Sequence, residues 1–226
     1  MSKIVLFGTG RGAEVAHRFI SADSDHEVVA FTVDGANLRE AHYRNLPVVP
    51  FEDVQRHYPP DQFRMLILLG YQQMNGLRAR KFAEAKSKGY TLESYVASNI
   101  FRVSPIDAGE NCFILDNQSI SLDVRIGNNV VMWSSNHIGD MSEVADHAWI
   151  SSHVTVAANV KIGERAFLGI GATVSNGVTI GNESFVGAHL LVSNDTPPHS
   201  VTLMDQSAAG IDSGTFMRLM MARKKL

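Results

Sequence analysis

A six-residue period constrains the fold of this chain more than any other feature of its sequence. From residue 114 to residue 192, every sixth residue is a large aliphatic side chain, and the fourteen positions are Ile114, Ile120, Ile126, Met132, Ile138, Val144, Ile150, Val156, Ile162, Leu168, Val174, Ile180, Val186 and Val192. The next residue is Gly, Ala or Ser in eleven of the thirteen hexads. Neither an α-helix nor a simple hairpin has this period, so the repeat decides the fold of the second half.

Such a repeat predicts a coil of triangular cross-section, with six residues on each side. Each side turns its aliphatic residue inward, and we expect the small residue to turn the corner. Successive coils then stack as parallel strands. The flat faces of this prism favour association. The period ends at Thr196-Pro197-Pro198, and a short basic helix is expected over residues 215–224.

The first 98 residues follow another pattern, in which short apolar runs alternate with helical segments. We expect strands at residues 3–7, 28–33, 65–69 and 92–96, and helices at 13–20, 51–57 and 77–88. Strands that alternate with helices predict a parallel sheet. The expected fold is therefore a small Rossmann-like α/β domain over residues 1–98, followed by a β-helix with a short tail over residues 99–226.

Composition excludes several classes of function. The chain has 20 Lys and Arg against 23 Asp and Glu, a net charge of −3, so it lacks the basic excess that a nucleic-acid partner requires. Its one cysteine, Cys112, excludes an intramolecular disulfide and a cysteine zinc site. No apolar stretch approaches the roughly 18 residues of a membrane span, and the start MSKIVLFGTG lacks the apolar run of a signal peptide. We expect a cytoplasmic protein that binds small molecules.

The combination of a glycine-rich βαβ half with a hexapeptide-repeat half resembles the bacterial sugar acetyltransferases of the bacillosamine N-acetyltransferase and sialic acid O-acetyltransferase type. The segments NVKIGE at 159–164 and FLGIGA at 167–172 carry the resemblance most strongly. It implies a left-handed parallel β-helix, a homotrimer, and acetyl transfer from acetyl-CoA to an amine or hydroxyl of a nucleotide-linked sugar. In this family the first half holds the nucleotide-sugar.

The nucleotide end is expected where the first strand meets the first helix. Glycines there allow the backbone to approach a diphosphate, and a helix N-terminus supplies free N–H groups. The candidate substrate-binding residues lie in this turn and at the ends of the neighbouring strands, with Gly70 and Arg78 matching the family's pattern; they are Gly8, Gly10, Gly12, Asp34, Gly70 and Arg78. Because the domain is about half a dinucleotide fold, it suits a mononucleotide better than a nicotinamide cofactor.

Acyl transfer needs a base that takes the proton of the nucleophile, and histidine is the usual base. The family carries a His followed by an acidic residue at a position that holds Asp140 and Met141 here, so that pair is missing. His137 lies in an irregular stretch, because Trp133 stands where a small residue is expected and Asn136 stands at an inward position. His137 is the candidate base, with Asp140 either orienting it or acting in its place. His147 and His153 are alternatives.

The acetyl-CoA site is expected further along the prism, where glycines leave the backbone N–H and C=O groups accessible to the pantetheine arm. The candidate residues are Gly163, Gly169, Gly171 and Gly187. A zinc hydratase of the γ-type carbonic anhydrase class is disfavoured. Those enzymes resemble one another in a His-x4-His pair, and no two histidines of these repeats have that spacing. The remaining alternative is a trimeric nucleotide-sugar-binding protein without catalysis, suggested by the missing His–acid pair.

Overall fold

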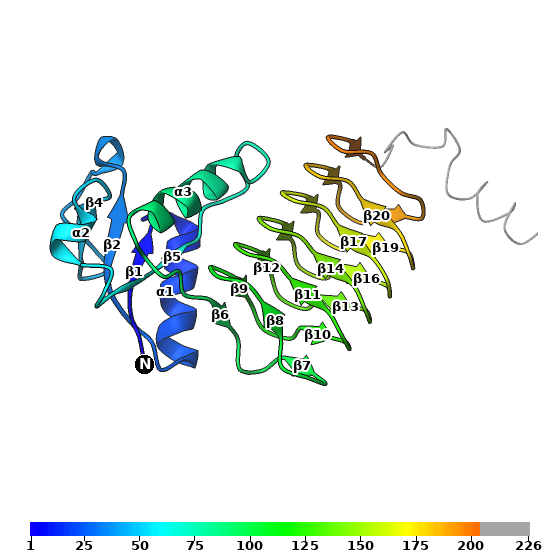
Figure 1. Ribbon diagram of the computed structural model, residues 1–226, viewed down its shortest axis with the longest axis horizontal. Coiled ribbons are helices and arrows are strands. Elements are labelled where there is room, and N and C mark those ends of the chain that lie inside the picture. Colours follow the sequence, from blue (N-terminus) through cyan, green and yellow to red (C-terminus); the bar gives the residue numbers. More distant parts are fainter. Residues whose placement is uncertain (204–226) are drawn as a thin grey trace, which may run out of the picture.

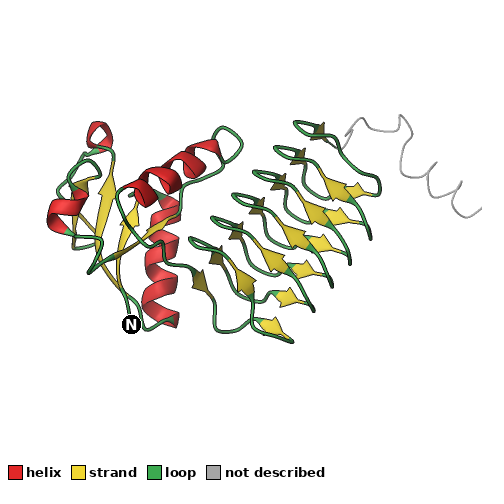
Figure 2. Cartoon of the chain, viewed as in Figure 1, coloured by secondary structure: helices red, strands yellow, loops and turns green. Residues whose placement is uncertain are grey.

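The computed structural model describes residues 1–203, which form an α/β half and a stack of short parallel strands (Figures 1 and 2). The parallel α/β sheet and the many short parallel strands agree with the expected fold class. The basic helix expected over 215–224 lies outside the described residues. Within residues 1–203, no helix combines the length and the apolar character that crossing a membrane requires.

The first half is built on a sheet whose spatial order is β3-β4-β2-β1-β5. Its elements are β1 (Lys3–Phe7), α1 (Arg11–Asp23), β2 (Glu27–Val33), the 3-10 turn η1 (Gly35–Asn37), β3 (His42–Tyr43), β4 (Leu46–Pro50), α2 (Val54–His57), β5 (Arg64–Ile67) and α3 (Gly76–Ser87). All neighbours are parallel except β3 and β4, which form a hairpin. The carboxyl ends of β1, β2 and β5 therefore meet at one edge, where α/β sheets bind ligands.

The second half is a triangular prism whose coils each take eighteen residues, so that His137 pairs with Ser119 and with Thr155. The first prism sheet contains β6 (Tyr95–Val96), β9 (Phe113–Ile114), β12 (Val131–Met132), β15 (Trp149–Ile150), β18 (Phe167–Leu168), β21 (Phe185–Val186) and β23 (Val201–Thr202). The second contains β7 (Phe101–Arg102), β10 (Ser119–Ile120), β13 (His137–Ile138), β16 (Thr155–Val156), β19 (Thr173–Val174) and β22 (Leu191–Val192). The third contains β8 (Asp107–Ala108), β11 (Arg125–Ile126), β14 (Glu143–Val144), β17 (Lys161–Ile162) and β20 (Thr179–Ile180).

The inward aliphatic residues of the hexads are buried in one continuous core, as the period predicts. The corner, however, lies further along than expected. The backbone turns at the third residue after each aliphatic from Ile114 to Val186. This residue adopts a left-handed conformation, as at Asn129 with φ 57° and His147 with φ 65°. The small residue instead faces the next coil, and a Cβ on Gly163 would lie 2.6 Å from the backbone nitrogen of Asn182. The residue after each inward aliphatic is therefore small because the next coil stacks directly against it.

The two halves are joined by a shared core. The outward side chains of the first prism sheet are mostly aromatic, and Tyr95, Phe113 and Trp149 pack in one cluster with Leu6 and Phe31 of the α/β half. The strand expected over residues 92–96 is divided between the halves, because Leu92 bridges to Met65 while Tyr95–Val96 pairs with β9. Figure 1 shows α3 extending from the α/β half toward the prism.

Candidate functional site

The turn after β1 has the backbone that a phosphate site requires. Gly8 has a φ of 109°, which side chains rarely tolerate, and Gly10 caps α1 without a side-chain hydrogen bond, so the first N–H groups of this helix are open. A Cβ on Gly10 would meet no atom within 4 Å. A Cβ on Gly12 would lie 2.8 Å from the Leu68 carbonyl oxygen, so Gly12 allows α1 to approach the end of β5.

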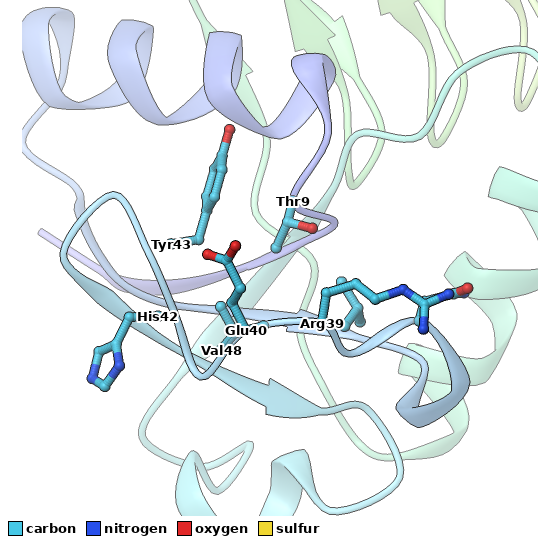
Figure 3. Close-up of a pocket in the computed structure, with 8 residues that line it drawn as sticks. Thr9, Arg39, Glu40, His42, Tyr43 and Val48 are labelled. Atoms are coloured by element: carbon cyan, nitrogen blue, oxygen red, sulfur yellow. The ribbon is translucent and has the colours of Figure 1, made fainter.

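A cavity of about 230 Å³ opens beside this turn (Figure 3). Thr9 of the turn and Val33 at the end of β2 line it, together with Arg39 and Tyr43 from the segment before β4. In Figure 3 the His42 ring points away from these groups. The expected nucleotide end thus coincides with a cavity at the carboxyl edge of the sheet.

Asp34 and Gly70 flank this edge, and Lys81 is a functional candidate that the sequence reasoning missed. The Asp34 carboxylate accepts a hydrogen bond from the Lys81 ammonium at 2.6 Å, and Lys81 also pairs with Glu84. Burial opposes the charge on Lys81, but these two carboxylates outweigh it and raise its pKa. The sequence signal that could have identified Lys81 is its position on α3, one helical turn after Arg78. Gly70 lies against the Gln72 side chain.

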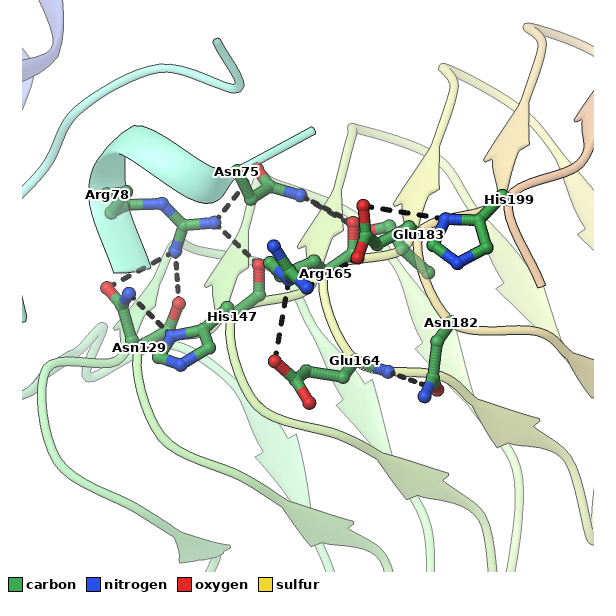
Figure 4. Close-up of polar contacts among 10 residues, drawn as sticks. Asn75, Arg78, Asn129, His147, Glu164, Arg165, Asn182, Glu183 and His199 are labelled. Carbon is green, nitrogen blue, oxygen red and sulfur yellow. Dashed lines mark hydrogen bonds and ion pairs between the residues drawn. The ribbon is translucent and has the colours of Figure 1, made fainter. Parts of the chain in front are cut away.

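The expectation that Arg78 contacts the substrate is corrected by the structure. Its side chain is fully buried between α3 and a corner of the prism (Figure 4). The guanidinium donates to the Asn129 carbonyl oxygen, to the His147 carbonyl oxygen at 2.9 Å and to Asn75 Oδ1 at 3.0 Å. Burial lowers its pKa to about 9. Arg78 therefore fastens the helix to the prism and does not face the cavity.

The candidate base, His137, lies in β13 with its imidazole exposed on the second prism sheet. Its Nδ1 is 3.3 Å from the Ser119 hydroxyl of the coil before. An exposed imidazole beside a hydroxyl is available for proton transfer. His147 lies differently, half-buried against Asn129, and burial lowers its pKa. His153 lies exposed at another corner of the prism.

Asp140 does not orient His137. Its Oδ1 accepts the backbone N–H of Leu122 at 3.0 Å, and no hydrogen bond or ion pair between Asp140 and His137 is found among the described residues. The same contact recurs at matching turns, where Asp146 accepts from the Asn128 N–H and Asn182 accepts from the Glu164 N–H. The carboxylate thus supports the stacking of coils.

The irregular residues before His137 are explained by packing. Asn136 is buried, and its Oδ1 accepts the Val154 N–H at 2.8 Å. Gln118, one coil earlier, donates to the Trp133 carbonyl oxygen at 2.7 Å. Trp133 packs against the core shared with the α/β half. The irregularity that made this stretch the candidate site therefore arises from a polar layer inside the prism and from contact between the halves.

The four glycines expected to hold acetyl-CoA are divided between two corners, and their N–H groups are occupied. Gly163 precedes the corner between the third and first prism sheets, whereas Gly169, Gly171 and Gly187 lie near the corner between the first and second. Each N–H donates to the next or previous coil, at 2.8 Å for Gly163, Gly169 and Gly187 and 3.0 Å for Gly171. The last three remain together along one edge.

The comparisons with known proteins support the fold. No model of a known family matches the chain, and no curated protein matches it in sequence. Among solved structures, it is similar to a mutant of perosamine N-acetyltransferase from Caulobacter crescentus in complex with CoA and GDP-perosamine, with 23% identity, coverage of 94% of this chain and 98% of that chain, and a TM-score of 0.79.

Two further structures share this architecture. The acetyltransferase domain of PglB from Neisseria gonorrhoeae, in complex with acetyl coenzyme A, has 16% identity, coverage of 88% of this chain and 94% of that chain, and a TM-score of 0.77. WeeI from Acinetobacter baumannii has 16% identity, coverage of 91% and 98%, and a TM-score of 0.77. The chain therefore has the fold of hexapeptide-repeat sugar acetyltransferases, as its resemblance predicted, and its stacked parallel strands fit their left-handed β-helix.

Proposed function

We propose that this protein is an acyltransferase that moves an acetyl group from acetyl-CoA to the amine or hydroxyl of a nucleotide-linked sugar in the cytoplasm. The observation that carries the proposal is the joining of two sites in one fold. A glycine turn with a cavity at the sheet edge is fastened to a hexapeptide prism, and the perosamine N-acetyltransferase solved with CoA and GDP-perosamine shares the fold over 94% of the chain.

The nucleotide would bind at the α/β half. Its diphosphate lies over Gly8 and Gly10, where the N-terminus of α1 offers open N–H groups. The base or ribose occupies the cavity of Thr9 and Tyr43, and Asp34, held by Lys81, stands at the same edge. The third glycine, Gly12, contributes by letting α1 approach β5.

Acetyl transfer would take place at the prism. The acceptor nitrogen or oxygen loses its proton to His137 and bonds to the acetyl carbon, while the carbon–sulfur bond breaks and the thiolate of coenzyme A leaves and takes up a proton. The pantetheine arm is proposed to follow the edge of Gly169, Gly171 and Gly187, using carbonyl groups because the N–H groups are occupied.

A second candidate function is nucleotide-sugar binding without catalysis. The observation that favours it is the turn of Asp140 and Met141, which lacks the His–acid pair that the resemblance implies and uses the carboxylate to support the fold. Purified protein incubated with acetyl-CoA and a panel of amino-sugar nucleotides separates the two. Release of free thiol that depends on the sugar supports the enzyme, whereas nucleotide-sugar binding without thiol release supports the binding protein.

A further inference from the structure

A groove of about 400 Å³ lies over the first prism sheet, beside the loop that follows β5. Tyr71 of this loop contacts the groove's floor, with its ring 5.4 Å from Trp149 and 4.9 Å from Phe167. Phe185 stacks on Phe167 at 4.7 Å, and Trp133 lies 6.1 Å from Trp149. Gly169 also lines this groove, so the groove adjoins the edge proposed above for the pantetheine arm.

The sequence opens this groove by a change in side-chain size along the prism. The residues that follow the inward aliphatics of this sheet are, in order, Leu115, Trp133, Ser151, Gly169 and Gly187. Leu115 and Trp133 fill the contact with the α/β half. From Ser151 onward the residues are small, so the aromatic rings of the strands are left with open space above them.

The groove lies close to the proposed diphosphate position. A Cβ on Gly8 would be 3.7 Å from the Leu69 side chain, and Gly12 lies against the Leu68 carbonyl oxygen. Tyr71 follows Leu69 by two residues and forms a wall of the groove. A group joined to a diphosphate at this turn can therefore follow the segment 68–71 onto the prism.

The chemistry of the groove selects its occupant. Aromatic faces pack against the C–H face of a sugar ring, and the hydroxyls of Ser151 and Ser152 supply a few polar partners, which is the usual composition of a small-molecule site. Among the described residues that line it, none carries a charge. A carboxylate placed here would lose hydration without gaining a partner.

We propose that this groove holds the pyranose ring of the nucleotide-linked sugar and that it selects an uncharged sugar over a carboxylated one. The inference rests on the proposed function, since the sugar reaches the groove only when its diphosphate occupies the turn after β1.

Intrinsic fluorescence tests the inference directly, because the only two tryptophans of the chain, Trp133 and Trp149, both line the groove. The ligands are UDP, UDP-glucose and UDP-glucuronate, with GDP, GDP-mannose and GDP-mannuronate as the guanosine series. Within the series that binds, we expect the hexose derivative to protect tryptophan emission from acrylamide. The nucleoside diphosphate should bind without protecting it, and the uronate should bind more weakly than the hexose derivative.

Variants assign the effect to the groove. Tyr71→Ala should weaken binding of the hexose derivative about 2- to 10-fold, the usual worth of one aromatic contact, and leave binding of the nucleoside diphosphate unchanged. Tyr71→Phe should retain affinity, and Ser151→Phe should fill the groove. Val103→Ala is the control, because Val103 is an exposed apolar side chain at 60% exposure that does not line the groove, and Tyr71 is 55% exposed.

Three outcomes would overturn the inference. Nucleotide-hexose binding that leaves the tryptophans unprotected and is unaffected by Tyr71→Ala would show that the ring lies elsewhere. Protection of the tryptophan emission by coenzyme A alone would show that the acyl donor occupies the groove. Equal affinity for the hexose and uronate derivatives would show that the groove does not select against a carboxylate. Failure of every nucleotide to bind would instead overturn the proposed function and this inference with it.

Discussion

The structural role of the Asp140 side chain depends on its oxygen as a hydrogen-bond acceptor and not on its negative charge. Its Oδ1 closes the turn by accepting the Leu122 N–H, a task that Asn128, Asp146 and Asn182 perform at matching turns. Since an amide oxygen accepts this bond as well as a carboxylate does, the fold requires an acceptor here and not a charge. Charge and structure can therefore be separated by substitution.

The first prediction uses this separation. His137→Asn should lower kcat about 10²- to 10⁴-fold, because general base catalysis contributes that much, and should leave acetyl-CoA affinity nearly unchanged. Asp140→Asn preserves the acceptor for Leu122 and should be mild by comparison. Steady-state kinetics of thiol release measures both. A large loss of kcat in Asp140→Asn alone would show that the Asp140 carboxylate, and not His137, is the general base.

The second prediction distinguishes two glycines of the β1 turn. Gly10→Leu should weaken nucleotide-sugar binding and leave the thermal midpoint unchanged, because its Cβ meets nothing within 4 Å. Gly12→Ala should lower the midpoint, since its Cβ would lie 2.8 Å from the Leu68 carbonyl oxygen. Calorimetric titration and thermal unfolding measure the two effects. If Gly10→Leu binds the nucleotide-sugar as tightly as the unsubstituted protein does, the nucleotide does not bind at this turn.

Residue types along one sequence do not distinguish a ligand contact from a buried structural contact. Arg78 was a candidate because it matches the pattern of the family that the sequence resembles, and Asn136 marked the candidate site because it breaks the repeat. Both side chains bond buried backbone groups. The backbone groups they satisfy, at Asn129, His147 and Val154, lie 18 to 69 residues away along the chain, and no local pattern records such contacts. The glycine turn between β1 and α1 was predictable because its strand, glycines and helix are consecutive in the sequence.

At the scale of elements, the contact between α3 and the prism depends on a polar network at one corner (Figure 4). Arg78 is its centre, and Asn75 donates through Nδ2 to the Arg165 carbonyl oxygen at 3.0 Å. Asn111 joins the same corner to β5, since its side chain bonds both the N–H and the carbonyl oxygen of Ile67. The angle between the two proposed sites is therefore fixed by hydrogen bonds as well as by apolar packing.

The third prediction removes the centre of that network. Arg78→Met should destabilise the protein by about 3 kcal/mol, because carbonyl oxygens of Asn129 and His147 lose charged donors and stay buried. Arg80→Ala is the control on the same helix, where the side chain is exposed. Chemical denaturation gives the free energy of unfolding for each. An Arg78→Met protein as stable as the control would contradict the assigned role.

The fourth prediction concerns pH. Burial lowers the pKa of His147 below its ordinary value of 6.5. The unfolded chain therefore takes up this proton first as pH falls, so the contribution of neutral His147 is complete above that value and is lost below it. The midpoint of thermal unfolding should drop between about pH 7.5 and about pH 5.5.

His147→Asn should make that drop smaller, because Asn111 and Asn129 hold the matching corners of earlier coils without titrating. Burial and two arginines also lower the pKa of His17, so His17 contributes the same sign and the variant should retain part of the drop. An unchanged pH dependence in His147→Asn would exclude His147 as its source.

Regular elements were predicted where a period or a consecutive pattern defines them. The hexads predicted the fourteen aliphatic residues from Ile114 to Val192 that the prism buries, and the helix expected at 77–88 lies at Gly76–Ser87. The β3–β4 hairpin was missed because its turn is formed by Arg44 and Asn45, both left-handed, instead of the familiar Asn-Gly. The true corner of each coil was missed because Asn, His and Arg occupy it as readily as glycine.

At the scale of the whole molecule, the three prism sheets have different surroundings. The first is covered by the α/β half, whereas the second and third face outward in the described chain. Large apolar side chains remain exposed there, with Phe101 and Leu191 on the second sheet and Leu122 and Met141 at the corner beside it. Exposed apolar groups on a flat, rigid face are typical of surfaces that associate.

The last prediction is that these faces meet in a homotrimer. Light scattering should give a mass three times the 24.7 kDa of the chain, because burying the exposed apolar groups of the second sheet and its corner favours association. Leu191→Lys combined with Met141→Lys should shift the protein toward monomer at micromolar concentration, while Leu203→Lys, an equally exposed apolar residue at the end of the first sheet, should leave the mass unchanged. A mass near that of one chain for the unsubstituted protein would contradict the prediction, and it would mean that a single chain supplies both proposed sites.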